Sequence, residues 1–269
     1  MRPDPPLDRK LLTRARFTYP WLRPDVAENY KPVNKQYGRN HYSPTEIAYT
    51  FNSNGYRCEE FTEPSDFPIV FIGCSITEGI GLHLEQTWSY LLLEKIREKT
   101  GKNIPYWSLA LTASGIDTQA RKLYWYGKQG FAKPKMIIGL TPPMERREFS
   151  YGFWKQNFWL AGGSFPWEIN HVFSDRNFAE DQSHRSFMIV DSLAEAWDAK
   201  VINAMWSYSF KDSSDESIYM KDAFPNFTHV DISDWKVFNK SWARDGMHWG
   251  PEMHQQIAED YWCKVELLL

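Results

Sequence analysis

The sequence has few cysteines, no long apolar run and no excess of positive charge. Its three cysteines, Cys58, Cys74 and Cys263, are too few and too scattered for a disulfide framework or a zinc-ligand spacing, so we expect buried free thiols. No stretch approaches the roughly 20 apolar residues of a membrane span. A net charge of -3 with 24% charged residues provides no broad basic field, so neither nucleic acid nor a membrane is expected as a partner.

Motifs of exported, metal-binding and nucleotide-binding proteins are also missing. Residues 1–17 carry prolines and charges where a secretory signal has an apolar segment. This predicts a soluble protein that is cytoplasmic, or that is released or assembled without such a signal. No metal-ligand cluster, phosphate-cradling glycine loop or dinucleotide fingerprint occurs, so we expect neither a metal nor a cofactor. The sequence leaves the oligomeric state open.

Aromatic residues, by contrast, are abundant, at 16% of 269 residues, with 13 Trp. A core rarely needs so many, which predicts that some of them lie on a surface that meets a ligand, such as sugar rings or another protein. The length and the lack of a clear linker favour one large domain. We assign it to residues 46–269, preceded by a proline-rich arm, residues 1–45, that packs on it.

The periodicity from residue 47 onward predicts an α/β domain. Residues 47–61 indicate a β-hairpin with its turn at Asn54-Gly55. From Phe67 the strand and helix patterns alternate, which favours a parallel sheet with right-handed crossovers and helices on both faces. The predicted strands are 68–73, 104–111, 135–141, 200–207 and 229–233, and the predicted helices are 85–99, 116–129, 185–197 and 251–266.

An insertion of about forty residues, 142–181, interrupts this alternation and is rich in Trp and Phe. A connection of this length is usually a lid or a binding loop, and the alternative is a hydrophobic cluster that covers a sheet edge. Because Trp rings stack on sugars, our candidate substrate-binding residues are three tryptophans of the insertion and one near the C-terminus. They are Trp154, Trp159, Trp167 and Trp249.

Two short segments carry the residue types of serine catalysis. In Phe67–Gly79, FPIVFIGCSITEG, a buried strand stops at glycine and presents Ser75 at its carboxyl edge, where open α/β sheets place their chemistry. Asp245 and His248 lie three residues apart on the loop before the last helix, so the carboxylate can orient the imidazole as a base. A D-x-x-H motif alone is weak, because a histidine near a helix start is often structural.

These segments resemble two of the four sequence blocks of the SGNH hydrolases, also called the GDSL esterase/lipase superfamily. Gly73–Gly79 is similar to the first block, with Cys74 in place of the usual Asp and Ser75 at the nucleophile position. Asp245–His248 is similar to the last block, which completes the triad. The resemblance covers roughly residues 45–269. It implies a three-layer α/β/α, flavodoxin-like fold with a five-stranded, mostly parallel sheet.

The two middle blocks match less closely. Ala110–Gly115 is similar to the block whose glycine N–H contributes to the oxyanion hole, which makes Gly115 the match, with a simple turn or helix-entry glycine as the alternative. Gly139–Pro142 stands where the family has Gly-x-Asn-Asp, and it contains no Asn. Losing one oxyanion donor typically lowers turnover by about 10²–10³-fold. Either Thr141, Asn157 or Asn170 therefore donates in place of the missing Asn, or the site is weak or inactive.

The resemblance implies a serine esterase with a Ser75–His248–Asp245 triad. Its oxyanion hole consists of the N–H groups of Ser75 and Gly115, together with Thr141. The expected partner is a small-molecule or glycan ester, and the aromatic insertion favours an O-acetyl or acyl group on a carbohydrate. Two alternatives remain: an O-acyltransferase with the same triad, and a non-catalytic carbohydrate-binding or structural module, for example of a viral or cell-surface assembly.

Overall fold

A computed structural model of the chain describes most of the residues from Phe17 to the C-terminus. The described residues are 17–22, 25–27, 30, 33–34, 38–39, 42–43, 46–144, 146–151, 154–158, 176–206, 222–231 and 242–269. Only the backbone is described for residues 33–34, 38–39, 147–151, 154–158 and 176–177.

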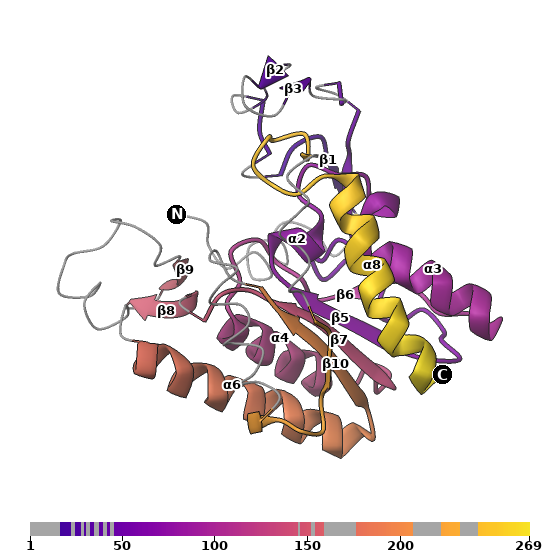
Figure 1. Cartoon of the computed structure of the whole chain (residues 1–269), viewed down its shortest axis with the longest axis vertical. Coiled ribbons are helices and arrows are strands. Elements are labelled where there is room, and N and C mark those ends of the chain that lie inside the picture. The colour runs from indigo at the N-terminus through magenta and orange to yellow at the C-terminus, as the bar shows by residue number, and fades with distance from the viewer. Residues whose placement is uncertain are drawn as a thin grey trace.

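A five-stranded parallel sheet forms the centre of the molecule (Figure 1). Its strands are β5 (Ile69–Gly73), β6 (Trp107–Ser108), β7 (Met136–Thr141), β10 (Lys200–Met205) and β11 (Thr228–His229). Their order across the sheet is β11-β10-β7-β5-β6, and every described pairing is parallel. Numbered along the chain, this is the 2-1-3-4-5 order of flavodoxin-like folds, in which ligands bind at the carboxyl ends of the strands.

Helices cover both faces of the sheet, so the predicted three-layer α/β/α fold is confirmed. One face carries α3 and α8, and the opposite face carries α4 and α6 (Figure 1). The helical segments are α2 (Ser75–Glu78), η1 (Leu84–Gln86), α3 (Trp88–Thr100), α4 (Ile116–Lys128), α6 (Arg176–Trp197), α8 (Pro251–Val265) and η3 (Glu266–Leu268).

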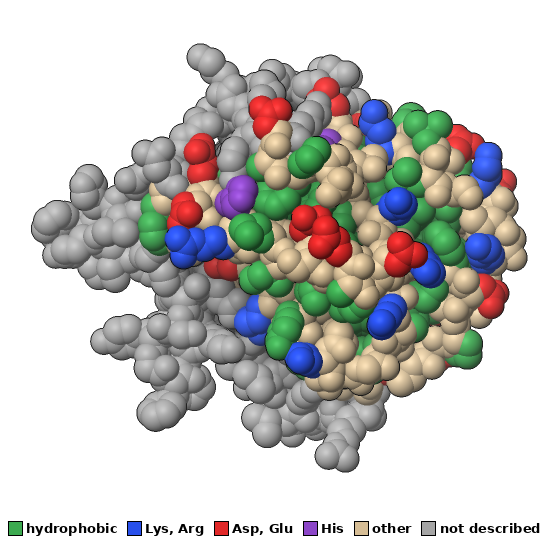
Figure 2. Space-filling model, turned by 90° about the horizontal axis from the view of Figure 1, so that it is seen from below, with side chains coloured by type: hydrophobic (Ala, Val, Ile, Leu, Met, Phe, Trp, Pro, Cys, Tyr) green, Lys and Arg blue, Asp and Glu red, His purple; other side chains and the backbone are tan. Residues whose placement is uncertain are grey.

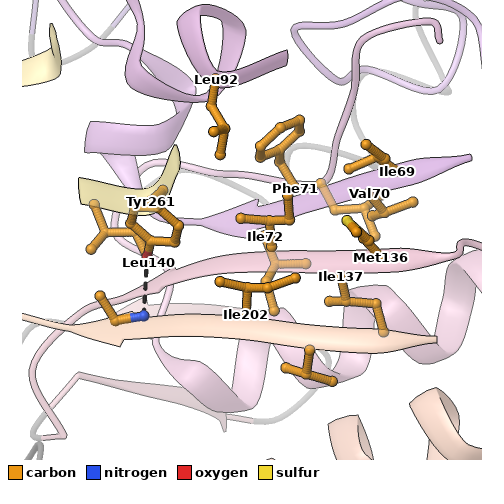
Figure 3. Close-up of a cluster of buried hydrophobic side chains, with 14 of the residues drawn as sticks. Ile69, Val70, Phe71, Ile72, Leu92, Met136, Ile137, Leu140, Ile202 and Tyr261 are labelled. Atoms are coloured by element: carbon orange, nitrogen blue, oxygen red, sulfur yellow. Dashed lines mark hydrogen bonds between the residues drawn. The ribbon is translucent and has the colours of Figure 1, made fainter. Parts of the chain in front are cut away.

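The core is built around β5, whose five residues are all buried. Phe71 points toward Leu92 of α3, whereas Ile72 points to the other side of the sheet (Figure 3). Burying one such side chain contributes about 1.5–3 kcal/mol. Tyr261 of α8 ties the layers together, because its hydroxyl donates to the carbonyl of Gly139 and accepts the N–H of Ala204 at 3.0 Å.

The predicted hairpin at 47–61 is wrong in its second strand. β4 (Tyr49–Phe51) pairs antiparallel with β1 (Phe17–Tyr19) of the N-terminal arm. The chain does turn after β4, but the Asn52 side chain accepts the N–H groups of Asn54 and Tyr56, and this cap ends the strand pairing. The arm itself contains a further two-stranded sheet, β2 (Val33–Asn34) with β3 (Gly38–Arg39).

Several element bounds also differ from the prediction. α6 begins at Arg176, nine residues before the expected start at 185, and therefore includes the end of the insertion. Ala179, Ser183 and Phe187 form its buried stripe at a spacing of four residues, and the polar Ser183 hides this stripe in the sequence. Two antiparallel strands, β8 (Arg147–Tyr151) and β9 (Trp154–Phe158), also lie within the insertion.

Two strands are shorter than predicted, and one cysteine is exposed where a buried thiol was expected. β6 is limited to Trp107–Ser108, although the N–H groups of Leu109 and Leu111 still donate to β5 carbonyls, so this segment follows β5 to its end. β11 spans Thr228–His229, where the pattern predicted 229–233. All three cysteines are free, as expected, but Cys263 on α8 is exposed rather than buried.

The surface shown in Figure 2 mixes acidic and basic side chains among hydrophobic ones, and neither sign of charge dominates that face. None of the described helices combines the length and the apolar character that crossing a lipid bilayer requires.

Candidate active site

Ser75 stands at the carboxyl end of β5, as the sequence predicts. Cys74 is the N-cap of the short helix α2, and Ser75 is its first residue, with 5% of its surface exposed. The turn requires Gly73, because a Cβ at that position lies 2.0 Å from Oγ1 of Thr77. Strand, glycine and short helix therefore place a serine hydroxyl at the edge of the sheet where open α/β folds bind ligands.

Asp245 and His248 form a hydrogen-bonded pair on the loop that precedes α8. Nδ1 of His248 lies 2.6 Å from Oδ2 of Asp245, and the carboxylate side chain is fully buried. The other oxygen of Asp245, Oδ1, accepts the N–H groups of Met247 at 3.0 Å and His248 at 3.1 Å. One carboxylate thus holds both the backbone of the loop and the imidazole.

The charge state of Asp245 determines which nitrogen of His248 is basic. Burial raises the pKa of Asp245, but the hydrogen bond from His248 and the N–H groups of Met247 and His248 lower it below its usual value. An ionised carboxylate can only accept, so Nδ1 of His248 is the protonated nitrogen. This bond therefore leaves Nε2 as the nitrogen that can act as a general base.

The loop of this pair is fixed to the Ser75 segment through its backbone. The N–H of Ala243 donates to the carbonyl of His248 at 2.9 Å, and the N–H of Arg244 donates to the carbonyl of Gly81 at 2.9 Å. Gly81 follows α2 by three residues, so the segment of Ser75 and the loop of Asp245 and His248 are directly hydrogen-bonded. These hydrogen bonds hold the two segments next to each other.

Ser75 and His248 line one pocket of about 480 Å³ at this edge of the sheet. The size is within the usual range for a small-molecule site, about 300–1,000 Å³. The described residues that line it are mainly apolar and aromatic; they are Ser75, Ile76, Thr112, Ala113, Arg146, Trp206, Trp242, Met247, His248 and Trp249. The pocket thus has a serine hydroxyl and an imidazole among mainly apolar and aromatic walls.

Within this pocket the described contacts do not include a direct hydrogen bond between Oγ of Ser75 and Nε2 of His248. Catalytic hydrogen bonds in ligand-free enzymes are often long and shorten only when substrate binds. Ser75 and His248 therefore line the same cavity. A direct hydrogen bond between Oγ of Ser75 and Nε2 of His248 is expected once substrate is bound.

The loop after β6 approaches the same pocket and contains Gly115. Thr112 and Ala113 line the pocket, and the carboxylate Oε2 of Glu78 accepts both the N–H and the hydroxyl of Thr112 at 2.6 Å. Gly115 is the N-cap of α4, and a Cβ there lies 2.2 Å from the carbonyl oxygen of Arg146. Gly115 therefore begins a helix and also lies where the backbone of Arg146 comes too close for a side chain.

Thr141, the candidate oxyanion donor, has its hydroxyl bonded to another side chain. Its side chain is fully buried at the end of β7, and its hydroxyl donates to Oδ1 of Asn203 at 2.9 Å. Thr141 is not among the described residues that line the pocket. Asn157 is described only as backbone, and Asn170 lies outside the described residues.

The four tryptophans expected to bind substrate divide into two groups. Trp249 lines the pocket and packs edge-on against Trp206, with ring centroids 5.6 Å apart. Trp154 is described only as backbone, and Trp159 and Trp167 lie outside the described residues. Their roles remain a prediction.

Sequence reasoning missed the other residues of the pocket wall, among them Trp206, Trp242 and Arg146. Trp242 and Met247 lie close to Asp245 and His248 in the sequence, and this proximity could have identified them as residues of the pocket wall. Trp206 directly follows β10 and was placed inside a predicted strand. Arg146 carried no signal, because an arginine in a long connection usually faces solvent. Among the described residues, His, Cys, Asp and Glu form no group of three that could hold a metal ion.

The parallel sheet and its two helical layers form a three-layer α/β/α fold with a serine at the end of β5, which is the fold that the sequence blocks imply. No protein-family model and no curated protein matches the chain. Solved structures do match. The chain is similar to TesA, with a TM-score of 0.53 and 16% identity over 75% of this chain and 99% of TesA.

Two further structures show the same fold. The esterase EstA from Pseudoalteromonas sp. has a TM-score of 0.51 and 13% identity over 76% of this chain and 98% of EstA. LAE5, an α/β hydrolase enzyme from the metagenome of Lake Arreo, Spain, has a TM-score of 0.51 and 14% identity over 78% of this chain and 100% of LAE5. At these identities the similarity establishes the fold, and the activity must be argued from the site.

Proposed function

We propose that the chain is a carboxylic ester hydrolase that uses Ser75, His248 and Asp245 as a catalytic triad. The observation that carries this proposal is the shared pocket, in which Ser75 and the Asp245-bound His248 meet at the carboxyl edge of the parallel sheet. The names of two structures of similar fold, an esterase and an α/β hydrolase, support the same reaction class.

In the first half of the reaction, Oγ of Ser75 attacks the ester carbonyl while Nε2 of His248 takes its proton. Asp245 stabilises the imidazolium that forms, because its carboxylate already accepts the Nδ1–H. The tetrahedral intermediate then collapses, His248 returns the proton to the departing alkoxide, and an acyl-Ser75 ester remains. In the second half a water molecule, deprotonated by His248, attacks this ester, and the acid and the Ser75 hydroxyl are released.

The negative charge of the tetrahedral intermediate needs N–H donors. The N–H of Ser75 lies at the N-terminus of α2, and that of Gly115 lies at the N-terminus of α4. Both are helix-start groups without an intrahelical partner, which makes them suitable donors to an oxyanion. The Thr141 hydroxyl, bonded to Asn203, contributes only after a rearrangement.

A carbohydrate ester suits the walls of this pocket. Trp206, Trp242 and Trp249 all line it, and flat indole rings pack on the apolar faces of sugars while hydroxyls stay hydrated. An O-acetyl group is small enough to place its carbonyl at Ser75 while the sugar ring contacts the tryptophans. We therefore infer deacetylation or deacylation of a sugar as the reaction.

Replacement of the nucleophile tests this proposal. We expect Ser75→Ala to lower the hydrolysis of p-nitrophenyl acetate and of O-acetylated xylo-oligosaccharides by about 10⁴-fold or more. Ser186→Ala is the matched control, because Ser186 is a buried serine on α6 that donates to a backbone carbonyl and does not line the pocket. Circular dichroism and thermal unfolding establish that both variants are folded.

Covalent labelling provides a second readout that does not depend on the choice of ester. A fluorophosphonate probe should label the wild-type protein at Ser75 and leave Ser75→Ala unlabelled; the similar structure of EstA was obtained with monoethylphosphonate as inhibitor. Equal hydrolysis by wild type and Ser75→Ala contradicts the proposal. Acetyl transfer to an added sugar acceptor at the expense of hydrolysis identifies the acyltransferase alternative.

A further inference from the structure

Glu78 links the two segments that carry the proposed N–H donors to the oxyanion. It is the last residue of α2, the short helix that begins with Ser75, and only 3% of it is exposed. Its Oε2 accepts both the N–H and the hydroxyl of Thr112 at 2.6 Å. Thr112 lies on the loop between β6 and α4, three residues before Gly115. One carboxylate, an acceptor that makes stronger hydrogen bonds than a neutral group, therefore joins the helix of Ser75 to the loop of Gly115.

The end of α2 that carries Glu78 is itself fixed by a buried arginine, Arg57. Nη1 of Arg57 donates to the carbonyl oxygens of Glu78 at 2.9 Å and Gly79 at 2.6 Å. Nη2 of the same side chain donates to the carbonyl oxygen of Leu82 at 2.8 Å. A planar guanidinium that bonds three carbonyl groups holds them in one arrangement. The Glu78 side chain therefore starts from a fixed backbone, and it can hold the loop that it bonds.

The loop that Glu78 bonds has a strained backbone. Ala113, which lines the pocket, has a φ of +66°, a left-handed conformation that residues other than glycine rarely adopt. Such a conformation persists where the surrounding structure enforces it. On one side of Ala113 the loop is bonded to Glu78 through Thr112, and on the other side the carbonyl oxygen of Arg146 lies against Gly115. The loop is therefore confined at both ends of the strained residue.

We infer that Glu78 is a positioning residue for the oxyanion hole, and that its two hydrogen bonds to Thr112 set the distance between the N–H groups of Ser75 and Gly115. This inference rests on the proposed function. Glu78 is not among the described residues that line the pocket, so it acts through Thr112 and does not touch the substrate. Both donors must lie within hydrogen-bond distance of the same oxygen, and a misplacement of about 1 Å can lower turnover by about 10²-fold.

Three variants test the two hydrogen bonds. Glu78→Met removes the acceptor and keeps a side chain of similar length. We expect kcat for p-nitrophenyl acetate to fall about 10²-fold with KM nearly unchanged, because the oxyanion forms only after the substrate is bound. Glu78→Gln should restore most of the lost kcat, since its amide oxygen can accept the same N–H and hydroxyl. Thr112→Val removes only the hydroxyl bond and should have a smaller effect of the same kind.

A thionoester separates the positioning of the oxyanion hole from a general effect on the fold. In the thionoester of p-nitrophenyl acetate a sulfur atom replaces the carbonyl oxygen, and sulfur accepts hydrogen bonds only weakly. The measured quantity is the ratio of kcat/KM for the oxygen ester to kcat/KM for the thionoester. We expect Glu78→Met to lower this ratio about tenfold or more, because the lost donor acts on the oxygen ester. Partial unfolding lowers both rates equally and leaves the ratio unchanged.

Glu60→Met is the matched control. The carboxylate of Glu60 accepts the N–H of Ser53 at 2.8 Å and the hydroxyl of the same residue at 2.7 Å, which is the same pair of bonds that Glu78 makes. Neither Glu60 nor Ser53 is among the described residues that line the pocket. Glu60→Met should therefore leave the ratio of oxygen ester to thionoester unchanged.

An unchanged ratio in Glu78→Met, with esters still hydrolysed by the wild type, overturns the positioning role and leaves the proposed function intact. The role is also overturned if Glu78→Gln restores none of the ratio. If circular dichroism shows that Glu78→Met does not fold, the ratio measured with Thr112→Val decides. A wild-type protein that neither hydrolyses esters nor reacts with the fluorophosphonate probe overturns the proposed function, and this inference with it.

Discussion

Arg244 and Asp25 form an ion pair that is completely buried, with Nη2 of Arg244 2.6 Å from Oδ2 of Asp25. The pair joins the N-terminal arm to the loop of the proposed catalytic pair, because Arg244 directly precedes Asp245. The hydroxyl of Tyr49 also donates to Asp25 and accepts the N–H of Gly81, three residues after α2. The arm therefore supports both the loop of Asp245 and His248 and the segment of Ser75.

Asp25→Asn should destabilise the protein by about 3–5 kcal/mol, because it leaves the buried guanidinium of Arg244 without its counter-charge. Thermal unfolding measures this as a decrease in Tm of about 10 °C. Glu259→Gln is the control, since Glu259 forms a half-exposed pair with Lys95, and exposed pairs contribute at most about 1 kcal/mol. Similar Tm values for the two variants contradict a structural role for the arm.

Gly81 is where the segment after Ser75 contacts the loop of Asp245 and His248. Its φ is +75°, and a Cβ there lies 2.7 Å from Cβ of Ala243 and 2.8 Å from the N of Arg244. Gly101 at the end of α3 has a similar φ of +64°, but a Cβ there meets nothing within 4 Å. The two glycines thus share a left-handed backbone conformation and differ in the space around them.

Gly81→Ala should therefore lower both stability and esterase activity, because the loop of Asp245 and His248 must move away from Ser75. Gly101→Ala should cost only the left-handed backbone strain, about 1–2 kcal/mol, with activity retained. Urea unfolding and hydrolysis of p-nitrophenyl acetate measure the two effects. If Gly81→Ala keeps full activity, the contact between the two loops is not what positions the site.

Most of the fold could be predicted from the sequence, and so could the position of Ser75 at the end of β5. The apolar run before Ser75 and the alternation of strands and helices are local patterns, which a sequence displays directly. The β1–β4 pairing was not predictable in this way, because it joins Phe17–Tyr19 to a strand thirty residues later. The Asn54-Gly55 turn suggested a nearer partner.

The pocket wall shows the same limit. Thr141 could be named as a replacement for the missing Asn, but its bond to Asn203 on the neighbouring strand depends on the register of the sheet. Arg146 lies in a connection without periodicity, and only the tertiary structure places its side chain against Trp206. Residue types and motifs identify candidate site residues. Whether each side chain is available to the site depends on contacts with distant parts of the chain.

Asp245→Asn separates the proposed catalytic role of this residue from its structural role. The Asn carbonyl oxygen can still accept the N–H groups of Met247 and His248, so we expect the loop to keep its shape. The amide no longer stabilises an imidazolium or the correct tautomer of His248, and turnover should fall by about 10⁴-fold. Kinetics with p-nitrophenyl acetate and a thermal scan measure the two roles separately.

The pH dependence of this variant provides a further check. Because the pKa of Asp245 is lowered in the folded protein, its carboxylate stabilises the fold above its ordinary pKa of about 3.9. That contribution is lost as the pH falls through the lower folded value. The difference in unfolding free energy between wild type and Asp245→Asn should thus be constant near neutral pH and decrease only in strong acid. A difference that is constant throughout the acid range excludes this role.

His254 should make the fold sensitive to mild acid. It is fully buried on α8, and its Nδ1 accepts the N–H of Trp88 at 2.9 Å, so the ring is neutral. Burial is the main cause that lowers the pKa of His254 from 6.5 to about 3, and electrostatic interactions with His248 and Arg57 act in the same direction. Between these two values the unfolded chain binds a proton that the folded chain does not. Stability is therefore complete above about pH 6.5 and decreases as the pH falls toward about 3.

His254→Asn tests this dependence, because the Asn carbonyl oxygen can accept the same N–H of Trp88 but does not titrate. For one proton the slope is about 1.4 kcal/mol per pH unit, so urea unfolding at several pH values resolves it. We expect the wild-type free energy of unfolding to fall relative to that of the variant from pH 6 to pH 4, and the two profiles to run parallel above pH 7. Parallel profiles from pH 4 to pH 8 would show that the histidine is protonated inside the fold, or that α8 opens before the proton binds.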